Sequence, residues 1–337
     1  MLNFDPTRFL RIQTGTVTIA RDLGALVGRL VAEGADSLFF MGSGGAGILM
    51  QPATDLMRRA STLPCHNVLC AEIVLTGHVA LGPKSVVIMP SLSGTTKESI
   101  AAMAYVKARG ATVVSITGHA DAPLAKGANH AFVNFAEDDT SCEMFYVTSL
   151  VAALAAMQAR GERSDYDRII GELSGLPQQL LAVKQAFEPR ADALAQAIAA
   201  DGWHILTGSG AAWPEAYYYG MCILEEMQWI RTRPVHASDF FHGTLELVEK
   251  GVSVVVFAGE DETRPLTDRV IAFAKGYTDK LTVLDTRDLP TTGLSADLRA
   301  LLAPALLATV LERLSAHLEV MRNHPLVTRR YYKRVAY

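Results

Sequence analysis

Hydrophobic and polar positions along the chain alternate between two periods, which predict strands and helices in turn. In the first half, continuous apolar runs at Ser37–Met41, Ser85–Pro90 and Thr112–Thr117 predict buried strands. Shorter runs at Asn67–Ala71 and Ala131–Phe135 predict two further strands. Strands that alternate with helical segments are typical of a parallel sheet whose two faces are both covered. The helices are expected over Val17–Ala32, from the glycine-rich turn at 42–47 to Ala60, over Lys97–Arg109 and over Ser141–Arg160.

The same pattern restarts after a mixed segment, Gly161–Leu180, which contains Gly175 and Pro177. Glycine and proline interrupt regular structure, so we expect the domain boundary in this segment. The strands of the second half are expected at Trp203–Thr207, Ser253–Ala258 and Leu281–Asp285, and its helices at Ala191–Ala200, Ala212–Trp229 and Ser295–Arg322.

Two glycine-rich turns recur at nearly constant offset. The GSG of 42–44 returns at 208–210, which is 166 residues later, and Ser91 and Gly259, which each follow a buried strand, lie 168 residues apart. Self-similarity at a fixed offset indicates an internal duplication. We therefore predict an α/β protein of two tandem doubly wound parallel sheets, with domains at 1–165 and 166–322 and a C-terminal tail at 323–337.

Composition narrows the functional class. The chain has 337 residues, 31 basic and 35 acidic side chains, and half of its residues are hydrophobic. This balance argues against disorder, a nucleic-acid partner and a polybasic membrane anchor. The apolar stretches Tyr146–Ala159 and Leu298–Leu314 are too short, or too interrupted by charges and proline, to span a membrane. The N-terminus lacks an apolar signal core and the four cysteines show no CxxC spacing, so we expect a cytoplasmic protein with reduced thiols.

The loop Ser91–Thr96, with the sequence SLSGTT, follows a buried strand and opens a helix. Its four hydroxyl groups, on Ser91, Ser93, Thr95 and Thr96, would join backbone N–H groups at the positive end of that helix, which favours an anion. No GK[ST] sequence follows, so a nucleotide P-loop is excluded. We expect a phosphate site; the alternative is a cluster of helix-capping residues. The second half has Gly-Glu-Asp-Glu-Thr at 259–263 in this place, and its three carboxylates should repel phosphate, so we expect one phosphate site per chain.

The turn Gly42–Gly47 matches GxGxxG, and Glu72 is expected at the end of the next strand. Together they fit a dinucleotide site. The alternative is that a tight strand-to-helix turn selects the glycines. In that case Ser43 and Gly44 would be additional phosphate donors.

Glu226 lies between Leu224, Met227 and Ile230 on an apolar part of its helix. Partial desolvation would raise the pKa of this carboxyl, as suits a general base near neutral pH. The neighbouring Glu225 fits a solvated position. His242 is flanked by two phenylalanines and Gly243, and a lone histidine of this kind is commonly structural.

Three segments resemble known families. SLSGTTKES resembles the phosphosugar signature of SIS (sugar isomerase) domains, and tandem SIS domains fit the duplication. LEEMQWI, followed by His242-Gly243, is similar to the acid/base segment of the isomerase half of glucosamine-6-phosphate synthase, although Thr244 replaces the usual proline. The end, HPLVTRRYYKRVAY, is similar to that of fructosamine-6-phosphate deglycases. The start, MLNFDP, lacks the N-terminal cysteine of a glutaminase domain, so ammonia delivery from glutamine is not expected.

The resemblance implies a deglycase that acts without a metal or cofactor on a phosphorylated sugar–amine conjugate. His242 would open the sugar ring, Glu226 would move a proton between C1 and C2, and water would hydrolyse the resulting imine. Lys333, in the tail, is at the place of a Schiff-base lysine of the synthase-like family; a basic surface residue is the alternative. The resemblance also implies a homodimer or dimer of dimers in which His242 serves a neighbouring subunit. The alternatives are an amino-sugar phosphate isomerase or deaminase and a non-catalytic phosphosugar-binding protein.

One sequence feature independently favours a shared interface. Six aromatic residues gather in the second half of a chain that is otherwise poor in them, and aromatic residues are enriched at interface cores. The alternative is that they pack the core of their own domain. They are Trp213, Tyr217, Tyr218, Tyr219, Phe240 and Phe241.

Overall fold

The computed structural model describes residues 1–137 and 139–336. The chain forms two compact units. The N-terminal unit comprises Pro6–Gln178 with Gly293–Leu298, and the C-terminal unit comprises Gln179–Thr292 and the chain from Arg299 onward, with Met1–Asp5. The chain crosses between the units at four points, one of which, between Gln178 and Gln179, falls in the interval 161–180.

The N-terminal unit is built on five parallel strands in the order β2-β1-β3-β4-β5. After β1 the chain places β2 on one side of β1, and it then returns to place β3 on the other side of β1. The strand order therefore reverses between β1 and β3, and open α/β sheets bind ligands at the carboxyl ends of the strands at such a point. The strands are β1 (Ser37–Gly42), β2 (Cys65–Leu69), β3 (Ser85–Pro90), β4 (Thr112–Thr117) and β5 (His130–Val133).

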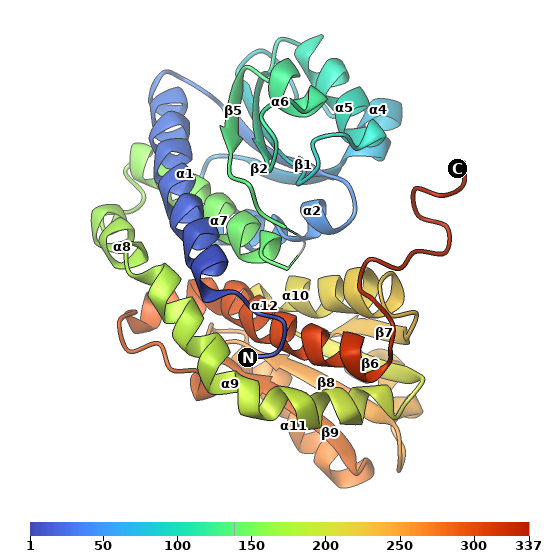
Figure 1. Ribbon diagram of the computed structural model, residues 1–337. Coiled ribbons are helices and arrows are strands. Elements are labelled where there is room, and N and C mark those ends of the chain that lie inside the picture. Colours follow the sequence, from blue (N-terminus) through green and yellow to red (C-terminus); the bar gives the residue numbers. More distant parts are fainter. Residues whose placement is uncertain (138, 337) are drawn as a thin grey trace. The chain divides into compact units, whose positions relative to one another are not determined.

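Helices cover both faces of this sheet, which confirms the doubly wound arrangement. In Figure 1, α4, α5 and α6 lie on one face, and α1 and α7 lie together on the other. The remaining helices follow β1 (α2 and α3) or α7 (α8) in the chain. The bounds are α1 (Pro6–Ala32), α2 (Gly45–Ile48), α3 (Gln51–Ala60), α4 (Cys70–Thr76), α5 (Lys97–Lys107), α6 (Pro123–Gly127), α7 (Ser141–Ala159) and α8 (Tyr166–Leu173).

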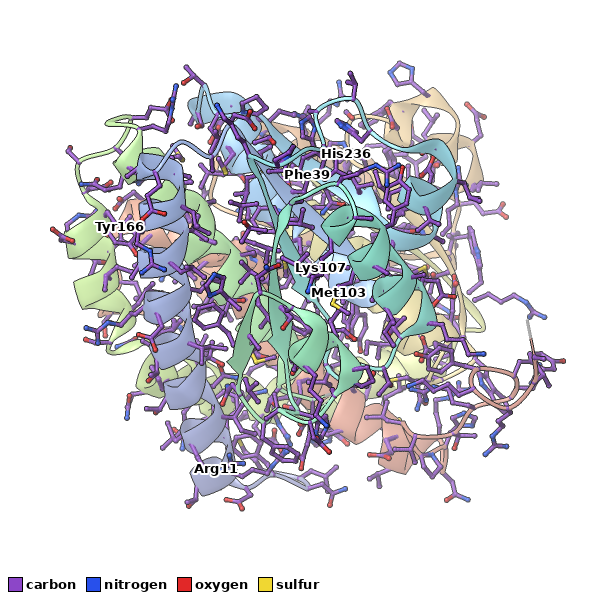
Figure 2. The ribbon with its side chains drawn as sticks, turned by 90° about the horizontal axis from the view of Figure 1, so that it is seen from above. Arg11, Phe39, Met103, Lys107, Tyr166 and His236 are labelled. Atoms are coloured by element: carbon purple, nitrogen blue, oxygen red, sulfur yellow. The ribbon has the colours of Figure 1, made fainter. Side chains whose placement is uncertain are left out.

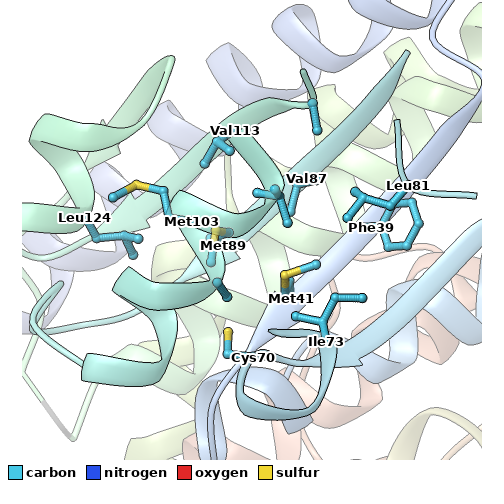
Figure 3. Close-up of a cluster of buried hydrophobic side chains, with 13 residues drawn as sticks. Phe39, Met41, Cys70, Ile73, Leu81, Val87, Met89, Met103, Val113 and Leu124 are labelled. Atoms are coloured by element: carbon cyan, nitrogen blue, oxygen red, sulfur yellow. The ribbon is translucent and has the colours of Figure 1, made fainter. Parts of the chain in front are cut away.

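One core cluster lies between the sheet and α4, α5 and α6. Figure 3 shows Met89 of β3 beside Met103 of α5 in this cluster, and Phe39 of β1 beside Leu81. Lys107, one turn after Met103 on α5, donates a hydrogen bond to the backbone carbonyl of Gly127 at the end of α6 (Figure 2). Burial of apolar side chains and this link fix α5, whose N-terminus follows the Ser91–Thr96 loop.

The C-terminal unit repeats the design with four parallel strands in the order β7-β6-β8-β9. Here the strand order reverses between β6 and β8, as it does between β1 and β3. The strands are β6 (Trp203–Gly208), β7 (Arg231–His236), β8 (Ser253–Ala258) and β9 (Lys280–Asp285), and the helices are α9 (Leu176–Ala199), α10 (Trp213–Tyr218), α11 (Arg264–Tyr277) and α12 (Ala296–Met321). The shared winding agrees with the duplication predicted from the sequence.

The structure differs from the predicted elements in several places: α1 begins at Pro6 and α9 at Leu176, earlier than the expected starts at Val17 and Ala191. β7 was not predicted from the sequence; it is an edge strand in which exposed arginines alternate with partly buried residues and Pro234 is tolerated. The expected helix Ala212–Trp229 consists of a 3-10 turn, α10 and a π-helical segment, η2 (Tyr219–Glu225). The mixed interval 161–180 contains α8 and the start of α9, because Pro177 stands in a first helical turn, where proline is tolerated.

Two helices, α7 and α12, are long and apolar enough to cross a membrane by length and composition. In each, however, 83% of the most apolar window is buried inside the structure. A helix that is hydrophobic on all sides and covered by protein is a core helix.

A buried ion cluster ties α9 to α12 in the C-terminal unit. Glu188 of α9 accepts hydrogen bonds from Arg313 Nε at 2.6 Å, from the backbone N–H of Leu2 at 2.7 Å and from His317 Nε2 at 3.1 Å. The Arg313 side chain is completely buried. Burial alone would raise the pKa of Glu188, but these hydrogen bonds prevail and lower it from 4.5 to about 2.

We expect this cluster to make the protein sensitive to acid. A carboxyl whose pKa is depressed in the folded state stabilises the fold above its unfolded pKa, and this contribution is lost as the pH falls. The free energy of unfolding should therefore decrease between about pH 4.5 and pH 2. Urea unfolding as a function of pH tests this, with Glu188→Gln as the comparison. If the wild type and the variant lose stability in parallel over this interval, Glu188 is not the group responsible.

Candidate functional site

The loop after β3 folds tightly around its hydroxyl groups. Ser91 is buried, and its Oγ accepts the Gly94 backbone N–H at 3.1 Å and lies 3.3 Å from Thr96 Oγ1. Gly94 has a φ of +62°, and a Cβ at this position would lie 2.5 Å from the Cβ of Ala122. Glycine is thus required for the turn that brings Ser91 and Thr96 together.

The other two hydroxyl groups of this loop lie on its outer side. Ser93 Oγ accepts hydrogen bonds from the Thr95 N–H at 3.3 Å and from Thr95 Oγ1 at 3.0 Å. Thr96 precedes α5, but its side chain makes no capping hydrogen bond to that helix. The capping alternative therefore does not explain the hydroxyl groups, which stand at the positive end of an 11-residue helix.

The loop after β1 leaves the sheet beside the loop after β3, because β1 and β3 are paired neighbours. Gly42 and Gly47 are in close contact, since a Cβ on Gly42 would lie 2.6 Å from the Gly47 Cα. Two of the glycines of the GxGxxG match are thus explained by the tight turn. Gly44 has a φ of +55°, and a Cβ at Gly44 would meet no atom within 4 Å. An open space therefore adjoins the backbone at this point.

Two polar residues that the sequence analysis did not single out support these loops. Ser99, in the first turns of α5, lies with its Oγ 3.5 Å from Ser43 Oγ and accepts a weak hydrogen bond from the Cys70 thiol at 3.8 Å. Burial raises the pKa of Cys70, which keeps the thiol protonated as a donor. Ser99 is the last residue of the SLSGTTKES segment, although it was not among the candidate residues, whereas no sequence signal marks Cys70.

The dinucleotide alternative required an acid at the end of the second strand. That expectation is wrong: β2 ends at Leu69, and Glu72 lies exposed in the first turn of α4. The short apolar run Asn67–Ala71 thus crosses from a strand into a helix. The dinucleotide interpretation of the GxGxxG match therefore lacks the acidic residue that it requires at the end of β2.

Glu226 follows the π-helical segment η2 in the C-terminal unit. Its N–H donates to the carbonyl of Met221 at 3.1 Å, one residue further back than in an α-helix. The carboxylate forms an ion pair with Arg329 of the C-terminal tail, with Oε1 2.9 Å from Arg329 Nε and side-chain exposures of 32% and 14%. The surroundings of Glu226 therefore include a cation, which differs from the apolar surroundings expected from the sequence.

Glu225 has a separate role in the same turn. It is exposed, and its Oε1 accepts hydrogen bonds from the N–H and Oγ1 of Thr232 at 3.2 and 2.6 Å. The two adjacent glutamates thus face different partners. They line one groove with residues of β6, of β7 and the segment before it, and of the tail: Trp203, Trp229, Ile230, Arg231, Thr232, Arg329, Arg330, Tyr331 and Tyr332. Only Lys333 of this tail was a candidate from the sequence; Arg329 was not predicted, although it belongs to an Arg-Arg pair in the tail.

His242 is exposed at the end of a short 3-10 turn, η3 (Phe240–His242). The turn is held by Phe240, which is completely buried in the core of the C-terminal unit, and by Phe241, which packs edge-on against Phe273. The imidazole is thus presented on a fixed backbone. Lys333 is also exposed, and its Nζ lies 5.2 Å from the ring centre of Tyr332.

The aromatic residues of the second half divide into two groups. Tyr218, Tyr219 and Phe240 are buried within the chain, whereas Trp213 and Tyr217 are partly exposed and stack at 5.8 Å. The enrichment of aromatic residues therefore reflects core packing for at least these three residues. The aromatic residues therefore give weaker support for a subunit interface than the composition suggested.

The structure thus assembles the candidate residues in two places. In the N-terminal unit, the loops after β1 and β3 bring the hydroxyl groups of Ser91, Ser93, Thr95 and Thr96 to the edge that carries Ser43 and Gly44. In the C-terminal unit, Glu226 adjoins the tail, while His242 and Lys333 lie at the surface. Over residues 1–137 and 139–336, no group of three or more His, Cys, Asp or Glu side chains could hold a metal ion.

The sequence of this chain is similar to a known domain family and to two deglycases. The SIS domain model matches residues 33–160. The chain is 32% identical to the fructosamine deglycase FrlB of Bacillus subtilis over 327 residues, which are 96% of this chain and 99% of the relative. It is 28% identical to the fructoselysine 6-phosphate deglycase of Escherichia coli, over 91% of this chain and 88% of that protein.

Two solved structures superpose on nearly the whole length of this chain. A Bacillus subtilis protein described as a phosphosugar isomerase superposes with a TM-score of 0.84 at 30% identity, covering 96% of this chain and 99% of that one. A Salmonella typhimurium protein of the same description superposes with a TM-score of 0.88 at 27% identity, over 95% and 97% of the two chains. With two parallel-sheet units of matching topology and a full-length relative of this kind, the chain is an enzyme that belongs to the family of SIS-domain phosphosugar isomerases and deglycases.

Proposed function

We propose that the protein cleaves a fructosamine 6-phosphate, a phosphorylated Amadori compound, into a hexose 6-phosphate and a free amine. The observation that carries this proposal is the full-length likeness to two deglycases, one of which is named for fructoselysine 6-phosphate. The hydroxyl-lined loop at the N-terminus of α5 supports the phosphorylated class of substrate, because it offers the donors that a phosphate requires.

In this proposal the substrate phosphate binds over the edge between β1 and β3. Ser91, Ser93, Thr95 and Thr96 donate their hydroxyl groups, and Ser43 and the Gly44 N–H contribute from the neighbouring loop. The existing hydrogen bonds among Ser91, Ser93, Thr95 and Thr96 preorganise the loop. Charge-assisted hydrogen bonds of this kind are about twice as strong as neutral ones, so phosphate is the main anchor of the substrate.

The chemistry follows from moving one proton. His242 assists opening of the sugar ring, which exposes the C2 carbonyl of the ketoamine. Glu226 removes a proton from C1 to give an enaminol and returns a proton to C2, which leaves a C1 imine. Water then adds to the imine carbon, and the C–N bond breaks to release the amine and the aldehyde of the hexose 6-phosphate. Lys333 would have its Schiff-base role only in a synthase-like reaction, since this substrate already carries nitrogen.

A substrate panel tests the proposal. Release of hexose 6-phosphate is measured from phosphorylated Amadori compounds of α-amino acids and of the lysine ε-amine, with glucosamine 6-phosphate alongside. Turnover of one or more Amadori compounds in preference to glucosamine 6-phosphate is expected. Preferential turnover of glucosamine 6-phosphate would identify an isomerase or deaminase, and binding without turnover of any compound would identify a phosphosugar-binding protein.

The phosphate anchor makes a separate prediction. Replacing Ser93 and Thr96 together with alanine should raise KM for the phosphorylated substrate at least about tenfold, because each lost charge-assisted hydrogen bond costs about 1.5–3 kcal/mol. Initial-rate kinetics measure the effect, and Thr18→Ala, which removes an exposed hydroxyl from α1 of the same unit, is the matched control. An unchanged KM in the double variant would show that this loop does not bind the substrate phosphate.

Titration with NADH should give no saturable fluorescence change, whereas micromolar binding would restore the dinucleotide alternative.

A further inference from the structure

The C-terminal unit contains the counterpart of the proposed phosphate loop. The loops after β6 and β8 leave neighbouring strands at the point where the strand order reverses, as do those after β1 and β3. Gly210 has a φ of +53°, and Gly44, 166 residues earlier, has a φ of +55°. The two units therefore form the same backbone turn at this edge of the sheet.

In the C-terminal unit the space beside this turn is filled by a carboxylate. Asp261 Oδ2 accepts the Ala211 N–H at 2.8 Å, and Asp261 Oδ1 accepts the Thr263 N–H at 2.9 Å and Thr263 Oγ1 at 2.5 Å. A Cβ on Gly210 would lie 2.3 Å from Asp261 Oδ2, whereas a Cβ on Gly44 would meet nothing within 4 Å. The same crevice is thus open in one unit and occupied in the other.

The hydrogen bonds identify the equivalent residue. Ser93 lies 168 residues before Asp261, and its Oγ accepts from the N–H and Oγ1 of Thr95 as Asp261 Oδ1 accepts from those of Thr263. A short hydroxyl in the first unit is therefore replaced by a longer, negatively charged group in the second. The longer side chain reaches across to the Ala211 N–H, which belongs to the opposite loop.

The two neighbouring glutamates do not share this role. Glu260 forms an ion pair with Arg299 of α12 at 2.8 Å, and Glu262 is exposed. From the sequence, all three carboxylates of this loop were expected to repel phosphate. The structure instead puts one of them in the crevice.

We propose that Asp261 is the built-in anion of the second crevice and the specificity-determining residue that keeps phosphate out of it. Its carboxylate accepts hydrogen bonds from backbone N–H groups and a threonine hydroxyl, which are donors that a phosphate oxygen would otherwise use. The restriction of the substrate phosphate to the first unit thus depends on a single side chain. This inference deepens the proposed function, on which it rests for the identity of the first phosphate site.

The test converts Asp261 to the residue of the first unit. Asp261→Ser is introduced into the full-length Ser93→Ala, Thr96→Ala protein, so that the first site is disabled, and binding of inorganic phosphate is measured by calorimetry. The variant should gain one saturable phosphate per chain relative to its parent. Its Tm should fall in chloride and recover in phosphate of equal ionic strength. Asp261→Asn, which keeps the volume but loses the charge, should gain no phosphate site and should lose stability in both salts.

The outcomes separate the two proposals. A folded Asp261→Ser variant that binds no more phosphate than its parent would overturn the role of Asp261, whatever the first site does. Strong phosphate binding by the parent would count against Ser93 and Thr96 and therefore against the proposed function alone. If Asp261→Ser fails to fold, Asp261→Asn decides: an asparagine variant as stable as the wild type would show that the carboxylate is not an essential anion in this crevice.

Discussion

Replacing Glu226 with glutamine is expected to lower kcat by about 10²–10⁴-fold, the usual contribution of a general acid–base group. The amide keeps the volume of the side chain but cannot accept the C1 proton. KM should change little, because the phosphate is held by the loop after β3. Steady-state kinetics at saturating substrate measure the effect, with thermal unfolding to show that the fold is retained.

Glu225→Gln is the matched control for this experiment. Glu225 is adjacent, exposed and bonded to Thr232 by its own carboxylate, so its replacement removes an equal charge from the same turn. We expect at most a few-fold effect on kcat. Equal losses in the two variants would show that the assignment of the base to Glu226 is wrong.

Mixing two inactive proteins is expected to restore activity. We propose, from the resemblance to the synthase family, that His242 completes the site of a neighbouring subunit in an isologous dimer. The exposed His242, on a turn anchored by Phe240, is consistent with this role. When Glu226→Gln and His242→Ala subunits are dissociated and reassembled together, each mixed dimer should hold one site with both native groups and one with neither. At equal amounts and random pairing, about a quarter of the wild-type activity should return.

The control for this mixture is each variant taken alone through the same dissociation and reassembly. Both should remain inactive. Mixed dimers verified by mass that show no recovery would mean that each chain completes its own site, as would a fully active monomer. A dimer of dimers would give the same recovery, since the pairing within each isologous dimer is unchanged.

The parts of the fold that could be predicted are those encoded locally. β3, β4 and β8 have the predicted bounds, because each is a continuous buried run of β-branched residues between polar loops. The Ser91–Thr96 loop could be located because four hydroxyl groups follow directly after a buried strand, and its role as a phosphate site stays a prediction. In both cases the signal lies within a few residues of the feature.

The parts that could not be predicted depend on distant contacts. β7 lies at the sheet edge, so its exposed arginines and Pro234 conceal a strand from any pattern of burial. The ion pair between Glu226 and Arg329 joins residues separated by most of the second half of the chain. In the sequence, Asp261 is one of three equivalent acidic residues. Only its closeness to Gly210 in the structure shows that it is the one that enters the crevice.

Recognition of the sugar by its phosphate, with release of a hexose 6-phosphate, can be measured with one pair of compounds. The rate of amine release is compared for one Amadori compound and its 6-phosphorylated form. We expect kcat/KM for the phosphorylated compound to exceed that for the unphosphorylated compound by at least about a hundredfold, since several charge-assisted hydrogen bonds of about 1.5–3 kcal/mol are lost without the phosphate. Equal kcat/KM values for the two compounds would contradict it.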